Sequence, residues 1–120
     1  MVKFHPIDNI LLSGGWDAHL KLWNEVYELK KSIPAHNYAI YSIAFSPDNK
    51  LFATGSRDKT IKIWDATNPE LPRSITFENL CGHQYSVNRL IWNEKDDNLI
   101  SASDDKKIMI WSIDHNLEQN

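Results

Sequence analysis

Cysteine is almost absent from the sequence, because Cys81 is the only one among 120 residues. One thiol cannot form a disulfide within the chain, and disulfides are the usual support of small secreted domains. The sequence also opens without the charged stretch and apolar run of a secretory signal peptide. Both absences favour a reducing compartment, so we expect a cytoplasmic protein. A lone cysteine before a glycine is more often a small packed residue than a nucleophile, and we assign Cys81 no catalytic role.

The sequence also lacks a strong excess of charge of either sign. The sequence has 13 Lys and Arg against 16 Asp and Glu, a net charge of −3, and its basic residues are not clustered. Nucleic acid or an anionic membrane surface would find no basic patch on such a chain. No apolar run approaches the length needed to cross a membrane. We therefore expect neither nucleic acid nor a membrane as partner, although 42% apolar residues indicate a folded globular protein.

The sequence lacks the usual patterns for cofactors and metals. It has no glycine-rich phosphate cradle. Its histidines stand far apart, without the spacing of zinc ligands. They are His5, His19, His36, His83 and His115. We interpret them as surface or hydrogen-bonding residues, and we expect no metal and no cofactor.

What the sequence does contain is one pattern that occurs three times. In each copy an Asp is followed six residues later by a Trp. The pairs are Asp17 and Trp23, Asp58 and Trp64, and Asp105 and Trp111. Both landmarks shift by 41 residues from the first copy to the second and by 47 from the second to the third. Unrelated Asp and Trp residues would not both shift by 41 and then both by 47, so the sequence contains an internal repeat.

Each copy has the pattern of β-strands. In the middle copy, residues 39–45 alternate and are rich in β-branched and aromatic side chains, and a turn sequence follows them. Residues 51–56 and 60–64 form two further runs, and 73–78 is a plausible fourth. No segment has a convincing helical stripe. The sequence predicts an all-β protein whose copies are four-stranded antiparallel meanders of about 40 residues.

These residues resemble the tryptophan-aspartate (WD-40) repeats, which form β-propellers. The resemblance rests on Gly82-His83, on Ala35-His36, on the segment 45–65 and on the three Asp-to-Trp spacings. It implies about three propeller blades, since one blade takes about 40–45 residues. The blades are expected at 1–34, 35–80 and 81–114, the third without its outer strand, and 115–120 is expected to be a tail.

The resemblance also implies a polar network of His, Ser, Asp and Trp within each blade. The expected members are His36, Ser56, Asp58 and Trp64 in the middle copy, and His83, Ser103, Asp105 and Trp111 in the third. The first copy has Asp17 and Trp23, but Gly15 replaces the Ser and no upstream His stands at the matching position, so its network should be incomplete. Ser, His and Asp also suggest a hydrolase. However, the set occurs twice, accompanies a Trp and lacks a G-x-S-x-G elbow, so we expect a structural role.

In this family partners usually bind the side that carries the loops before the first strand and between the second and third strands of each blade. We call this side the loop face. The resemblance places seven residues there: Trp16, Tyr38, Tyr41, Arg57, Tyr85, Asn88 and Asp104. Tyr, Trp and Arg are enriched in binding hot spots. Tyr38 and Tyr85 could instead only pack their loops, whereas Trp16 lies in a turn with little cover.

We therefore predict a non-catalytic WD-repeat scaffold that binds a protein or peptide through its loop face. One alternative is a structural segment that only completes a larger or oligomeric propeller. A propeller hydrolase or lyase is the weakest alternative. The fold by itself does not decide among them.

Three blades do not close a ring, because propellers typically have about 4–8 blades. Two broad sheet faces should remain bare, and apolar faces of that size call for a cover. Three alternatives stay open. The chain is the C-terminal part of a larger propeller, or two copies form a six-bladed ring, or the three blades persist as an open arc. The remaining blades of a propeller, or another copy of the chain, are therefore further expected partners.

Overall fold

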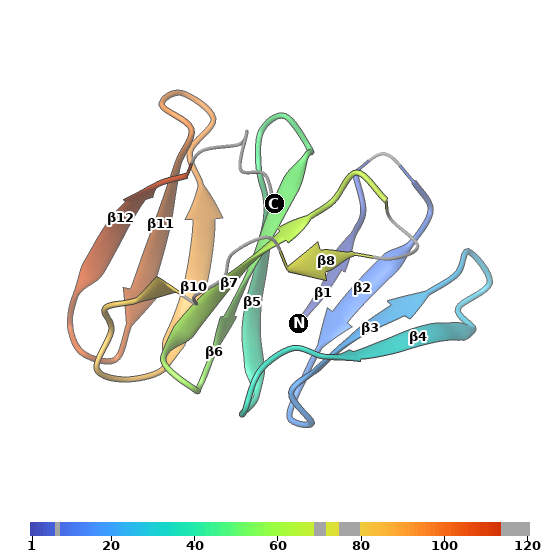
Figure 1. The fold of residues 1–120 in the computed structure, drawn as a ribbon, viewed down its shortest axis with the longest axis horizontal. Coiled ribbons are helices and arrows are strands. Elements are labelled where there is room, and N and C mark those ends of the chain that lie inside the picture. The colour runs from blue at the N-terminus through green and yellow to red at the C-terminus, as the bar shows by residue number, and fades with distance from the viewer. Residues whose placement is uncertain (7, 69–71, 75–79, 114–120) are drawn as a thin grey trace.

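The computed structural model describes residues 1–6, 8–68, 72–74 and 80–113, and every regular element in this part is a β-strand. The strands form three antiparallel sheets that lie side by side like the ribs of a fan (Figure 1). They form no closed ring in the described part of the chain. The all-β class and the incomplete propeller predicted from the sequence are both confirmed. No described segment is a helix long and apolar enough to span a membrane.

The first sheet contains four strands that pair in chain order. They are β1 (Val2–Phe4), β2 (Leu11–Gly14), β3 (His19–Trp23) and β4 (Leu29–Pro34). The apolar residues Leu12, Leu20 and Leu22 alternate with more accessible ones along β2 and β3, so they share one buried face. The outermost strand, β4, is almost wholly exposed.

The second sheet lies in the middle of the fan. Its strands are β5 (Ile40–Phe45), β6 (Leu51–Ser56), β7 (Thr60–Asp65), β8 (Arg73–Ser74) and β9 (Leu80–Cys81). Both β8 and β9 pair with β7, at its two ends. Of the expected fourth strand at 73–78, only β8 falls among the described residues. The Cys81 side chain is not among them either, so its packed role stays a prediction.

The third sheet has three strands in the part of the chain that the structure describes. They are β10 (Val87–Trp92), β11 (Asn98–Ser103) and β12 (Ile108–Ser112), paired in that order. The expected tail at 115–120, which includes His115, lies outside the described residues. The blade boundaries proposed from the sequence therefore stay predictions.

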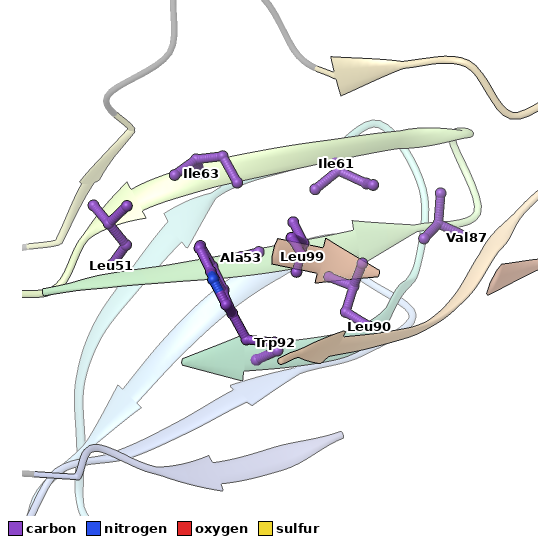
Figure 2. Close-up of a cluster of buried hydrophobic side chains, with 9 residues drawn as sticks. Leu51, Ala53, Ile61, Ile63, Val87, Leu90, Trp92 and Leu99 are labelled. Atoms are coloured by element: carbon purple, nitrogen blue, oxygen red, sulfur yellow. The ribbon is translucent and has the colours of Figure 1, made fainter. Parts of the chain in front are cut away.

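The middle sheet is buried on both faces because the other two sheets pack against it. On one face, Ile61 and Ile63 meet Leu90 and Leu99 of the third sheet (Figure 2). The opposite face presents Trp64, which belongs to the cluster shared with the first sheet. This split of neighbouring residues between two faces is the alternation expected of a β-strand. It also explains why all six residues of β6 are buried.

Candidate functional site

Five connections lie on the same side of the fan, at its lower edge in Figure 1. They are the β2–β3, β6–β7 and β11–β12 turns, the β4–β5 connection and the segment between β9 and β10. Together they form the loop face. Five of the seven candidate binding residues lie in these connections: Trp16, Tyr38, Arg57, Tyr85 and Asp104. The other two, Tyr41 and Asn88, belong to β5 and β10 and are half-buried.

The β2–β3 turn holds Trp16 in an open position. The side chain is 79% exposed, which is unusual for an indole. The carbonyl of Gly15 accepts hydrogen bonds from Ala18 N (3.2 Å) and from Ile40 N (3.0 Å). The carbonyl of Ala18 in turn accepts from Ala35 N and His36 N, both at 3.2 Å. The turn is thus fixed to the neighbouring β4–β5 connection while its Trp points into solvent.

The structure brings Tyr38 and Arg57 together across two connections. The guanidinium carbon of Arg57 lies 5.7 Å from the centre of the Tyr38 ring, within the range of a cation–π contact. The Ser56 hydroxyl donates to the Tyr38 carbonyl (3.1 Å), and Arg57 N donates to the Ala39 carbonyl (2.9 Å). Both side chains nevertheless remain exposed. They form a rigid aromatic and cationic pair that a partner could reach.

The third sheet arranges its candidates differently. Asn88 Nδ2 donates to Asp104 Oδ1 at 2.7 Å, so these two polar side chains already satisfy each other in part. Tyr85 lies in the segment before β10 and is more than half exposed. The aromatic and charged groups of the loop face are therefore spread over all three sheets.

A chain of hydrogen bonds lies beneath the loop face in the middle sheet. Trp64 Nε1 donates to Thr54 Oγ1 (3.0 Å), which lies 2.7 Å from His36 Nε2, and His36 Nδ1 lies 2.9 Å from Asp58 Oδ2. An indole N–H only donates and a carboxylate only accepts, so the chain runs from Trp64 towards Asp58. The same carboxylate also accepts from Asn37 N (3.1 Å). The network therefore anchors the β4–β5 connection to the sheet.

The third sheet repeats this chain atom for atom. Trp111 Nε1 donates to Ser101 Oγ (2.9 Å), His83 Nε2 lies 2.8 Å from that oxygen, and His83 Nδ1 lies 2.9 Å from Asp105 Oδ2. The Gln84 N–H donates to the same carboxylate at 3.0 Å. The expected polar network is thus present in two sheets, with His, Asp and Trp in the predicted places.

The hydroxyl groups of the network differ from the sequence prediction. Ser56 Oγ donates to the Tyr38 carbonyl and accepts from Asp58 N, and Ser103 Oγ accepts from Asp105 N, so both serines shape turns. The oxygens between His and Trp belong instead to Thr54 and Ser101, two residues earlier in each strand. Placing Ser56 and Ser103 in that position was wrong.

The first sheet has the beginning of the network without the His. Trp23 Nε1 donates to Ser13 Oγ (2.9 Å), so the expectation that Gly15 had replaced the hydroxyl residue was also wrong. Asp17 is exposed and pairs with Lys21 at 2.8 Å. A hollow of about 380 Å³ borders Ser13, Asp17 and Trp23, where the other sheets hold an imidazole. Among the described residues, no His ring joins Ser13 to Asp17, so the chain of hydrogen bonds seen in the other two sheets is not repeated within this part of the first sheet.

The network carboxylates have perturbed acidities. Burial by itself raises the pKa of Asp58, but hydrogen bonds from His36 and Thr60 outweigh it and hold the pKa well below its usual value. Burial also raises the pKa of Asp105, but hydrogen bonds from His83 and the Gln84 N–H lower it further, so the pKa lies below its usual value. At Asp17 the hydrogen bond from Lys21 lowers the pKa. The side chains of Asp58 and Asp105 thus remain ionised acceptors near neutral pH.

This geometry suits a structural network better than a catalytic one. Thr54 and Ser101 are completely buried, so neither hydroxyl could reach a substrate without opening of the sheet. Each hydroxyl also accepts from a Trp, a group that a nucleophile does not need. In the described residues no three His, Cys, Asp or Glu side chains come close enough to hold a metal ion.

A family model described as "WD domain, G-beta repeat" matches three regions of the chain, at residues 1–24, 27–65 and 74–112. Each matched region contains one Asp-to-Trp repeat and most of the strands of one sheet.

Several characterised proteins are similar to the chain. The nuclear distribution protein nudF of Aspergillus niger is 33% identical over 116 residues, covering 93% of this chain and 25% of nudF. The small ribosomal subunit protein RACK1y of Oryza sativa is 30% identical over 118 residues, covering 94% of this chain and 32% of RACK1y. The serine-threonine kinase receptor-associated protein of Gallus gallus is 28% identical over 95 residues, covering 79% of this chain and 26% of that protein. The chain thus spans between a quarter and a third of the length of these relatives.

Proposed function

Since this chain belongs to the WD domain, G-beta repeat family, we propose that it is a non-catalytic scaffold whose loop face binds a protein or peptide. The observation that supports this most is Trp16, an indole 79% exposed on a turn that hydrogen bonds hold in place. A rigid, exposed aromatic side chain loses little conformational entropy when a partner covers it.

Two further features support the same surface. The pair of Tyr38 and Arg57 adds an exposed ring and a cation whose mutual contact fixes their positions. Trp, Tyr and Arg are the residues most enriched among hot spots, and here they lie on adjacent turns. One relative is named for its association with a receptor, and none of the three names assigns an enzymatic activity. A cytoplasmic location remains a prediction.

Selection of a random peptide library against the purified chain tests the proposal. Bound peptides are re-measured against Trp16→Ala and Arg57→Ala by fluorescence polarisation. The Trp16 variant should weaken binding at least about tenfold, as expected of a hot-spot aromatic residue. Val26→Ala is the control, because Val26 is exposed on the β3–β4 turn, at the opposite side of the sheet. If no loop-face variant affects any selected peptide, the chain instead only completes a propeller through its sheet faces.

A further inference from the structure

The charged side chains of the fan are distributed unevenly between the two ends of its strands (Figure 1). At the ends opposite the loop face, the described parts of the β1–β2, β3–β4, β5–β6 and β10–β11 connections contain mostly carboxylates. These are Asp8, Glu25, Glu28, Asp48, Glu94, Asp96 and Asp97, against Lys50 and Lys95. The loop face instead carries the exposed cations Arg57, Lys59, Lys106 and Lys107. Folding therefore separates charges that are mixed along the sequence.

The carboxylates of the loop face already have partners. Asp17 pairs with Lys21, and Asp104 accepts a hydrogen bond from a side-chain amide of β10. Asp58 and Asp105 belong to the polar networks, and their side chains are only 6% and 2% exposed. In the described part of the chain no ion pair includes any of the four exposed cations. The positive groups of this surface are therefore the ones that a partner would meet.

Arg57 is held in a position suited to binding an anion. Its guanidinium carbon lies 5.7 Å from the centre of the Tyr38 ring, so the ring supports the planar group from one side. The N–H groups at the edge of a guanidinium remain available in such a contact, and their fork matches the two oxygens of a carboxylate. An acidic side chain on a partner would thus gain a charge-assisted hydrogen bond without displacing an ion pair.

Trp16 supplies an apolar contact beside this cation. The Gly15 carbonyl accepts from Ile40 N and the Ala39 carbonyl accepts from Arg57 N, so two consecutive residues tie the two turns together. Packed sheets lie about 10 Å apart, and an extended peptide advances about 3.3 Å per residue. A peptide that crosses the sheets therefore needs about three residues to pass from one turn to the next.

Resting on the proposed loop-face function, we propose that the partner is an acidic peptide in an extended conformation. An apolar side chain of the peptide packs on Trp16, and a carboxylate about three residues away binds Arg57. A second carboxylate, about three residues further along, meets Lys106 and Lys107 on the third sheet. The β2–β3 turn contains no cation, so the apolar end of the peptide belongs there.

Peptides selected from a random library against the full 120-residue chain test the proposal. They should contain more Asp and Glu than Lys and Arg. Replacing the acidic residues of a selected peptide with Gln or Asn should weaken binding about tenfold at about 50 mM salt, measured by fluorescence polarisation. The difference should shrink at about 500 mM salt, because exposed charges are then screened.

Two double variants of the chain locate the charges that act on the peptide. Lys106→Glu with Lys107→Glu should slow the association of acidic peptides about tenfold at low salt, since exposed charges steer the encounter. Lys50→Glu with Lys95→Glu is the matched control, because it makes the same change in net charge with exposed lysines at the other ends of the strands. The control should change the rate by less than about twofold. Circular dichroism should show that both variants remain folded.

The outcomes separate this proposal from the proposed function. Selected peptides that depend on Trp16 but have no acidic excess would overturn the acidic partner and leave peptide binding in place. If no selected peptide depends on the loop face, both proposals are wrong. Equal effects of the two double variants would also overturn the acidic partner, since net charge rather than the loop face would then determine binding. A single-stranded oligonucleotide that displaces the peptides at equal concentration would do the same, because the surface would then attract any polyanion.

Discussion

Thr54 joins the Trp64 indole to the His36 ring, and Thr54→Val keeps the shape of the side chain while removing its oxygen. The buried indole N–H would then lack an acceptor. We expect the free energy of unfolding to fall by about 1–3 kcal/mol, measured by urea denaturation at neutral pH. A catalytic hydroxyl would predict the opposite, namely a stable fold without turnover.

Thr67→Val is the control for this change, because the Thr67 hydroxyl is exposed and water can replace it. Its cost should stay within about 0.5 kcal/mol. If both variants lost the same stability, the hydroxyl of Thr54 would have no special role in the network.

The identity of this hydroxyl could have been found from the sequence through strand register. The β6–β7 turn pairs Phe52 with Trp64 and Thr54 with Lys62. Thr54 is therefore the diagonal neighbour of the Trp, within reach of a large side chain, whereas Ser56 lies two residues further towards the turn, beyond the pair of Gly55 and Ile61. Residue types predicted which groups form the network, but only the register decides which oxygen meets the indole. Ser101 and Ser103 repeat the same relation in the third sheet.

At the scale of strands and sheets, glycines set how closely two sheets approach. A Cβ added at Gly55 of β6 would lie 2.8 Å from Val87 Cγ1, a branched and buried neighbour in the third sheet. Gly55→Ala should therefore destabilise the protein by about 1–3 kcal/mol through overpacking, measured by urea denaturation.

Gly15→Ala is the matched control for this prediction, because no atom lies within 4 Å of the position of its added Cβ. It should cost little or nothing. Equal losses at Gly15 and Gly55 would mean that backbone conformation, rather than the packing of the sheets, determines the effect.

The strands themselves were largely predictable. In the middle sheet, β5, β6 and β7 match the expected runs to within about one residue, because alternation and turn residues both mark their limits. By contrast, β4 lacks such a signal, since its residues are nearly all exposed and two of its six are lysines. It is a strand because β3 offers it a row of unpaired backbone groups, which single-sequence patterning does not detect.

At the scale of the whole molecule, the repeat predicted which kind of surface would be left over but not how it would be covered. Periodicity makes the first and third sheets equivalent to the middle one, so their outer faces inherit an apolar composition. What covers these faces depends on rotation between sheets and on contacts between chains. Neither property is encoded in the pattern of a single repeat.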